Sequence, residues 1–332
     1  MSLKYKIALV IKSIKAAANC VVSKKKGLVP VTILRIEEII YGVNDLNTCV
    51  EFMENWGLEK VEYNVNGAVF KTSENQVIKL LMSDDESLPP THEQGSTVRE
   101  VVWGVENKVD LGKIAAELNL DRDVSLDHNG GLHSQDDCGN FIGFKSAEVI
   151  KANTQRAEFN FHENIERLNA RAWPDERAHP LRIGHIVYSI EREGNWDAAK
   201  FYMDRLNFRL SDRSEDGGTF LRCDGSQFHH TLFLFHRQGT SRYFNHVAFE
   251  VNSFDEIMTG GRHMLESGGQ SISGPGRHSL GSNLFWYFKN PCGGDIEYFA
   301  DMDRMTDDWE PRFWDESPPY ARWMIGDDVL TG

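Results

Sequence analysis

Three short stretches in the last third of the chain decide how its fold is interpreted: RIGHIVY (Arg182–Tyr188), FNHVAFEV (Phe244–Val251) and DIEYFA (Asp295–Ala300). Each stretch has the β-branched and aromatic content of a strand, and each carries a candidate metal ligand. These side chains are His185, His246 and Glu297. Two imidazoles and one carboxylate on one face of an ion, with open positions opposite, are typical of non-haem Fe(II) sites. The sequence therefore predicts such a site, assembled from three strands.

The composition describes a soluble globular protein that is long enough for two domains. The chain has 332 residues, of which 40% are hydrophobic and 26% charged. No apolar run approaches the ~20 residues that a membrane-spanning helix needs. The net charge is −14, and it becomes −21 beyond the Lys-rich first 34 residues. Such a body repels phosphate backbones, so nucleic acid is not expected as a partner. The five cysteines form no CxxC pair, which favours a cytoplasmic location.

The order of predicted elements divides the chain into parts. A pattern of strand, helix and several strands begins near Val31 and returns at Leu181. The parts are a basic N-terminal arm (1–30), an N-terminal domain (31–150), a linker with a helix near residues 157–172 (151–180), a C-terminal domain (181–303) and an aromatic tail (304–332). Lys12 and Lys15 interrupt the apolar run that a signal peptide would need, so the arm is not expected to direct export.

The two domains look like copies of one duplicated β-α-β-β-β module. RIEEIIY (Arg35–Tyr41) aligns with Arg182–Tyr188 at an offset of 147, and REVVWGV (Arg99–Val105) aligns with the region around His246 at an offset of 146. In the first copy, the three positions that carry ligand candidates in the second are assigned to Glu38, Glu100 and Ile142. That set lacks a third ligand, so the first copy is expected to be scaffold without a metal site.

Further side chains of the second copy could take part in chemistry. His229-His230 precedes a predicted strand, and a His beside an open metal site can act as an acid or base because its pKa lies near neutrality. Tyr287 is expected next to Glu297 on the adjacent strand of one hairpin. An ordinary surface His pair and a core aromatic are the other interpretations. The tail could close the mouth of a pocket or pack on a neighbouring subunit.

Together these residues resemble one family. The set consists of Gly184-His185, His229-His230-Thr231-Leu232, Asn245-His246, Gly276-Arg277-His278, Tyr287 and Glu297, in this order. With it, the chain resembles the type I extradiol ring-cleaving dioxygenases of the vicinal oxygen chelate superfamily, which also contains glyoxalases and bleomycin resistance proteins. The resemblance covers about residues 33–303. The tail is similar to that of the subgroup acting on carboxylated catechols such as dihydroxycumate.

The resemblance implies an α+β fold with two tandem vicinal oxygen chelate domains, each of paired βαβββ modules forming a curved mixed sheet around a pocket. It implies Fe(2+), with Mn(2+) as the other option, held by His185, His246 and Glu297. It makes His230 the acid/base residue beside the reacting oxygen, with His278 and Tyr287 on the substrate hydroxyl oxygens. Family members often have polar residues near the positions of Leu280 and Gly281, so the hydrogen-bond network behind His230 must be supplied differently here.

The implied activity is extradiol, or meta, cleavage of a substituted catechol by O2, giving a muconic semialdehyde-type product. The expected partners are a small aromatic diol and O2, in a homo-oligomer without membrane contact. Two alternatives stay open at this point. A glyoxalase-like metal-dependent isomerase or epimerase would collect ligands from both copies, which Ile142 argues against. A non-catalytic protein that binds aromatic compounds would hold no iron tightly and consume no O2.

Overall fold

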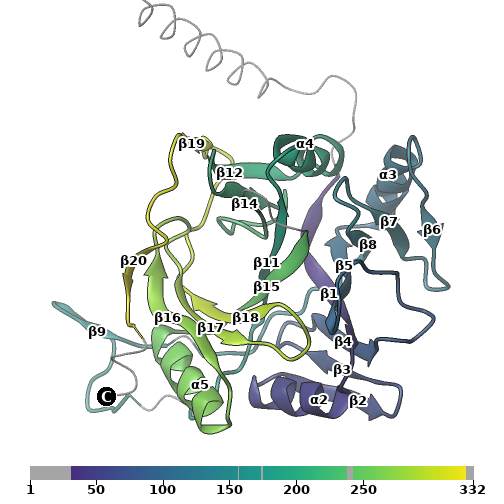
Figure 1. Cartoon of the computed structure of the whole chain (residues 1–332). Coiled ribbons are helices and arrows are strands. Elements are labelled where there is room, and N and C mark those ends of the chain that lie inside the picture. The colour runs from purple at the N-terminus through teal and green to yellow at the C-terminus, as the bar shows by residue number, and fades with distance from the viewer. Residues whose placement is uncertain (1–30, 156, 173–174, 238–241, 327–332) are drawn as a thin grey trace, which may run out of the picture. The chain divides into compact units, whose positions relative to one another are not determined.

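The computed structural model describes residues 31–155, 157–172, 175–237 and 242–326. The predicted basic arm, residues 1–30, lies outside this part of the chain. Two mixed sheets dominate the described residues (Figure 1). This architecture confirms the predicted α+β fold with two sheet modules, whereas the residue limits proposed for the domains stay a prediction.

The first sheet has eight strands in the order β2-β3-β4-β1-β5-β8-β7-β6. Its strands are β1 (Ile33–Val43), β2 (Glu59–Asn64), β3 (Gly67–Lys71), β4 (Val77–Met82), β5 (Thr97–Val105), β6 (Ser125–Leu126), β7 (Leu132–Gln135) and β8 (Phe141–Ser146). Helix α2 (Leu46–Asn55) follows β1, and helix α3 (Lys108–Leu118) follows β5. The sheet thus contains two βαβββ modules, joined where β1 pairs with β5 in antiparallel fashion.

The second sheet repeats this plan and extends it at both edges, in the order β19-β12-β13-β14-β11-β15-β18-β17-β16-β20. Its strands are β11 (Arg182–Glu191), β12 (Arg209–Ser214), β13 (Gly218–Arg222), β14 (Leu232–Arg237), β15 (Tyr243–Glu250), β16 (Ser271–His278), β17 (Leu284–Lys289), β18 (Asp295–Ala300), β19 (Arg312–Trp314) and β20 (Ala321–Met324). Its helices are α4 (Asn195–Lys200), which continues as the π-helical turn η1 (Phe201–Arg205), and α5 (Phe254–Glu266). The sheet follows a curved arc, with α5 beside β16 and β17 (Figure 1).

The two sheets share one strand register, which explains the nearly constant offset between the copies. In β1 and β5, Glu38 pairs with Val102 after a bulge. In β11 and β15, His185 pairs with Ala248 after a bulge at the same place. A bulge inserts one unpaired residue and re-aims the side chains that follow it. The duplication therefore preserves both the strands and their irregularities.

Buried polar and aromatic groups join the two sheets at equivalent points. The fully buried Gln76 side chain donates to the Ile36 carbonyl (2.5 Å) and the Ile183 carbonyl (3.2 Å), and it accepts from the Ile183 N–H (2.8 Å). Ile36 and Ile183 are 147 residues apart and occupy the same position in β1 and β11. The Trp56 ring stacks on Tyr298, with centroids 3.5 Å apart. The second sheet is thereby held in register against the first.

The predicted helix near residues 157–172 is wrong. In its place, the described residues of the linker form a two-stranded hairpin of β9 (Asn160–Phe161) and β10 (Asn164–Ile165). Phe161, Ile165 and Leu168 are 61%, 65% and 78% exposed, so no apolar face of this segment is buried against the sheets. Helical spacing alone does not stabilise a helix without such packing. Glu163 has a φ of 61°, which a turn tolerates and a helix does not.

Replacing either of two helix glycines by alanine should change the free energy of unfolding, but in opposite directions. A Cβ on Gly261 of α5 would lie 2.2 Å from Trp286 Cε3, and the Trp286 indole is fixed by its hydrogen bond to Ser271 Oγ (2.9 Å). The gain of about 1 kcal/mol in helix propensity is outweighed by overlap costing about 2–3 kcal/mol, so Gly261→Ala should destabilise the protein. Gly112 of α3 faces open space, so Gly112→Ala should stabilise it by about 0.5–1 kcal/mol. Urea denaturation measures both, and equal shifts would contradict the packing argument.

Candidate metal centre

Strand register brings the three predicted ligands together. In neighbouring strands β11, β15 and β18, His185 pairs with Ala248, and Ala248 pairs with Glu297. Paired residues on adjacent strands project on the same face of a sheet, and so do residues two apart on one strand. His246 is two residues before Ala248, so it shares this face. The small, fully buried Ala248 side chain leaves the space between the three ligands open.

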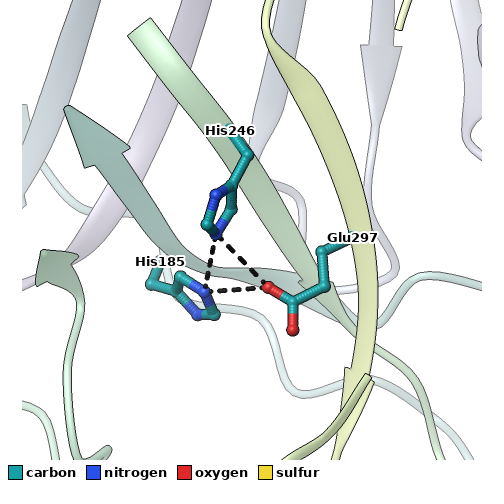
Figure 2. Close-up of side chains that lie close together, drawn as sticks. All are labelled: His185, His246 and Glu297. Carbon is teal, nitrogen blue, oxygen red and sulfur yellow. Dashed lines mark hydrogen bonds and ion pairs between the residues drawn. The ribbon is translucent and has the colours of Figure 1, made fainter. Parts of the chain in front are cut away.

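The donor atoms of the three side chains converge on one point (Figure 2). His185 Nε2 is 3.0 Å from Glu297 Oε2, and His246 Nε2 is 3.4 Å from the same oxygen. The two Nε2 atoms are 3.4 Å apart. The residues His185, His246 and Glu297 are 2%, 8% and 0% exposed. The three donor atoms are close together and deeply buried, so they form a compact candidate metal site.

Neighbouring amides fix the orientation of two of these ligands. Asn245 Oδ1 lies 2.8 Å from His246 Nδ1, and an amide oxygen can only accept, so Nδ1 carries the hydrogen. The lone pair of His246 is therefore on Nε2, which faces the other two ligands. Asn283 Nδ2 donates to Glu297 Oε1 over 3.1 Å. His185 lacks such a partner within the described residues, because its buried Nδ1 forms no hydrogen bond there.

The donor atoms of the site fit a divalent metal ion. Across residues the structure describes, the buried Glu297 Oε2 atom receives no hydrogen bond, which is costly for a carboxylate oxygen unless a cation is present. Ligand atoms about 2.1 Å from an ion and at right angles to each other lie about 3 Å apart. The observed separations of 3.0–3.4 Å are close to this value. Imidazole and carboxylate donors without thiolate suit iron or manganese.

Burial favours the neutral form of the His185, His230 and His278 imidazoles. Desolvation lowers the pKa of His185, although Glu297 opposes that effect, and it lowers the pKa of His278 to about 4. The pKa of His230 is held well below its usual range by burial and by the surrounding histidines. Burial by itself would raise the pKa of Glu297, but His185 and His246 outweigh it and hold that pKa low. At neutral pH, Glu297 is therefore a charged carboxylate, and His185, His230 and His278 offer neutral nitrogens.

His278 and Tyr287 form a hydrogen-bonded pair beside the ligands. The Tyr320 carbonyl lies 3.1 Å from His278 Nδ1, so that nitrogen carries the hydrogen. His278 Nε2 then accepts from the Tyr287 hydroxyl over 3.1 Å. Tyr287 pairs directly with Glu297 across β17 and β18, which confirms that these two residues lie on adjacent strands of one hairpin. The Tyr287 oxygen keeps its lone pairs for a further donor.

The aromatic tail lies against the second sheet at both edges. β19 pairs with β12, and β20 pairs with β16. The Tyr320 ring packs on His278 with centroids 4.8 Å apart. The tail thus closes one side of the site, as one of the two interpretations of the sequence expected. Sequence reasoning had given no role to Tyr320, Asn245 or Asn283, because each contributes through a contact that only the folded chain creates.

The corresponding positions of the first sheet hold charges that neutralise one another. Strand register assigns the third position to Gly143, which pairs with Val102 as Glu297 pairs with Ala248. The assignment to Ile142 was therefore wrong by one residue. Glu38 Oε2 accepts from Lys145 Nζ over 2.6 Å. Glu100 Oε1 lies 2.8 Å from His133 Nδ1 and raises the pKa of that imidazole. Lys145 and His133 thus pair with the two carboxylates at a site without a third ligand.

Comparison with known proteins agrees with this architecture. Residues 182–298 match the model of the Glyoxalase/Bleomycin resistance protein/Dioxygenase superfamily. These residues run from the start of β11 into β18 and include all three ligand candidates. The second sheet is therefore similar to this superfamily over these residues, and the first sheet repeats its βαβββ modules.

The proteins that are similar to this chain include a metapyrocatechase, a glyoxalase and a 2,3-dioxygenase. A segment of 131 residues is 37% identical to Metapyrocatechase 2 from Cupriavidus necator, and it spans 39% of this chain and 39% of that protein. The fold is similar to that of a Mn(II)-bound glyoxalase from Novosphingobium aromaticivorans (TM-score 0.70, 24% identity, 89% of this chain and 92% of that one). It is also similar to that of the 2,3-dioxygenase LapB from Pseudomonas sp. KL28 (TM-score 0.68, 18% identity, 86% and 99%). The predicted resemblance to type I extradiol dioxygenases is confirmed.

No helix among the residues that the structure describes is both long and apolar enough to cross a bilayer.

Proposed function

We propose that this chain is an extradiol dioxygenase that opens the ring of a substituted catechol beside its two hydroxyl groups. The observation that carries the proposal is the convergence of His185 Nε2, His246 Nε2 and Glu297 Oε2 at separations of 3.0–3.4 Å. Two of the three are neutral nitrogens, so the site leaves positive charge on a bound ion to attract a diol. The similarity of a 131-residue segment to Metapyrocatechase 2 supports the same reaction class.

His185, His246 and Glu297 would hold Fe(2+), or Mn(2+). When bound, such an ion brings the diol and O2 side by side and lets electrons pass between them. The product is of the muconic semialdehyde type. Because these three side chains would hold the ion from one side only, both reactants could reach it from the other.

The residues around the ligands would bind and orient the diol. The Tyr287 hydroxyl donates to His278, so its oxygen can accept a hydrogen bond from one hydroxyl group of the substrate. His230 lies with its ring 4.2 Å from that of His185 and offers a neutral imidazole next to the ligands. These side chains are at most 14% exposed, which limits water around the reacting groups. Within this proposal His230, Tyr287 and His278 are the catalytic residues.

Oxygen uptake separates this function from its alternatives. The protein is loaded with Fe(II) under anaerobic conditions and mixed with a panel of catechols, and O2 consumption is measured together with the yellow ring-fission product. We expect both signals for at least one substituted catechol, with one O2 consumed for each ring opened. Metal-dependent isomerase activity without O2 uptake would favour the glyoxalase-like function. The similar fold of the Mn(II)-bound glyoxalase is the reason to test for it. Binding of catechols without turnover would indicate an aromatic-binding protein.

Loading with Mn(II) in the same assay compares the two metals directly. The location in the cytoplasm and the homo-oligomer stay predictions, and gel filtration with light scattering tests the latter.

A further inference from the structure

A buried chain of hydrogen bonds lies behind His230. His230 Nδ1 is 3.0 Å from His229 Nδ1, and His229 Nε2 is 2.8 Å from Asp212 Oδ2. The Trp314 indole donates to Asp212 Oδ1 over 2.7 Å. Asp212, His229 and His230 are 2%, 1% and 5% exposed. The chain therefore runs from the tail strand β19 through the protein interior to the candidate metal centre.

The hydrogens in this chain can point in only one direction while Asp212 is ionised. A carboxylate only accepts, so Asp212 Oδ1 accepts from the Trp314 indole and Oδ2 accepts from His229 Nε2–H. A neutral His229 then has its lone pair on Nδ1. His230 Nδ1 must donate to that lone pair, which leaves the lone pair of His230 on Nε2. One carboxylate thus determines the tautomers of two imidazoles.

The surroundings hold His229 in place. Its backbone N–H donates to the Asp303 carbonyl over 2.9 Å. A Cβ at Gly281 would lie 3.1 Å from His229 Nδ1, so the His229 ring fills the space beside this glycine. The polar network that the sequence lacked near Leu280 and Gly281 is in this way supplied by His229 from another loop.

We propose that Asp212 and His229 are positioning residues that keep His230 in the tautomer with hydrogen on Nδ1 and the lone pair on Nε2. This inference rests on the proposed function and specifies the direction in which His230 works. His230 Nε2 accepts a hydrogen bond from a hydroxyl group of the bound diol and donates none to it. Trp314 orients Asp212, which connects the aromatic tail to the catalytic site.

The substitution Asp212→Asn reverses the chain with little change in shape. An asparagine oxygen can still accept from Trp314, but its NH₂ group donates to His229 Nε2. His229 then carries its hydrogen on Nδ1 and donates to His230 Nδ1. His230 then carries its hydrogen on Nε2. That N–H can no longer accept the hydrogen bond that a substrate hydroxyl group would donate. The variant therefore tests the direction of the hydrogen bonds more than their presence.

Nitrogen-15 NMR of the metal-free protein reads the tautomers directly. Two-bond proton–nitrogen correlations of ¹⁵N-histidine-labelled protein distinguish a protonated ring nitrogen from a bare one, and the His230→Gln spectrum assigns His230. We expect a protonated Nδ1 and a bare Nε2 for His230 in the wild type, and the opposite in Asp212→Asn. A wild-type His230 with hydrogen on Nε2 overturns the inference, whether or not the variant folds.

Steady-state kinetics of the Fe(II)-loaded enzyme provides the second readout. We expect Asp212→Asn to lower kcat by about 10²-fold, since an Asp→Asn change that imposes the wrong tautomer on a catalytic histidine has large effects. KM should change less than about threefold, because binding through the metal ligands is retained. The matched control is Asp136→Asn, which alters another buried carboxylate that accepts from the Tyr202 hydroxyl (2.8 Å). Equal losses in both variants would overturn the inference.

The two readouts keep this inference separate from the proposed function. A bare His230 Nε2 in a protein that cleaves no catechol would support the tautomer and contradict the function. Ring cleavage by a wild type whose His230 has hydrogen on Nε2 would support the function and contradict the inference.

Discussion

Replacing His246 by alanine is expected to abolish tight metal binding and ring cleavage together. The variant removes one of three donor atoms that lie 3.0–3.4 Å apart, so an ion would keep only His185 and Glu297. Loss of a direct ligand should weaken metal affinity by more than the 10- to 100-fold typical of residues that only orient ligands. We expect less than about a tenth of the wild-type metal content after dialysis and at least a 10³-fold loss of kcat/KM. Elemental analysis and oxygen uptake measure these quantities.

The first sheet provides a control for this variant that is matched by register. Glu100 occupies in β5 the position that His246 occupies in β15, and it is also buried. Glu100 pairs with His133, so Glu100→Ala should cost stability without removing the bound metal. We expect one metal ion per chain in the wild type and in Glu100→Ala. Undiminished turnover of His246→Ala would exclude His246 from the ligand set, and loss of metal in Glu100→Ala would place an ion in the first sheet.

The convergence of the three candidate ligands was predictable because it depends on strand positions that repeat at a nearly fixed offset. His185, His246 and Glu297 each lie inside a strand with clear β-branched and aromatic content. The first copy lacks this combination, so comparing the two copies pointed to these three residues. Strand pairing preserves such positions, since a shift of one residue would turn every side chain to the other face. The pairing of Tyr287 with Glu297 followed from the same logic.

Details that depend on bulges, loops and edge strands were not predictable. The position equivalent to Glu297 is Gly143, one residue from the position that alignment by eye suggested. Strand β12 went unnoticed because its sequence, RLSDRS, looks solvent-exposed, although Asp212 and its neighbours are buried. They are buried because β19 of the tail pairs with β12, a contact across about 100 residues. The partners of His229 were hidden for the same reason.

The substitution Gly184→Ala is expected to damage both the fold and the site. Gly184 lies in the bulge between Ile183 and His185, and a Cβ there would lie 2.2 Å from Phe299 Cζ. Phe299 is fully buried and packs against His185, with ring centroids 5.2 Å apart. Overlap with a rigid ring costs about 1–3 kcal/mol, and relief by movement of β11 would displace His185. We expect a lower urea midpoint together with weaker metal binding.

The first sheet shows how the same position accommodates a side chain. Register places Glu37 and Lys145 where the second sheet has Gly184 and Phe299. A lysine side chain can bend away from its neighbour, whereas a phenyl ring cannot. Glycine at position 184 is therefore required by the ring at position 299, and a smaller residue at 299 should remove the requirement.

A double-mutant cycle with Phe299→Ala tests this dependence. Phe299→Ala alone should cost about 3–5 kcal/mol because it leaves a cavity in the core. In the double variant, the Cβ added by Gly184→Ala occupies part of that cavity, so its own cost should fall close to zero. We expect a coupling free energy of about 1–3 kcal/mol between the two substitutions, measured by urea denaturation of the metal-free protein. Additive losses of stability would mean that the backbone at the bulge moves to accommodate the added methyl group. The Phe299 ring would then not be the reason why position 184 requires glycine.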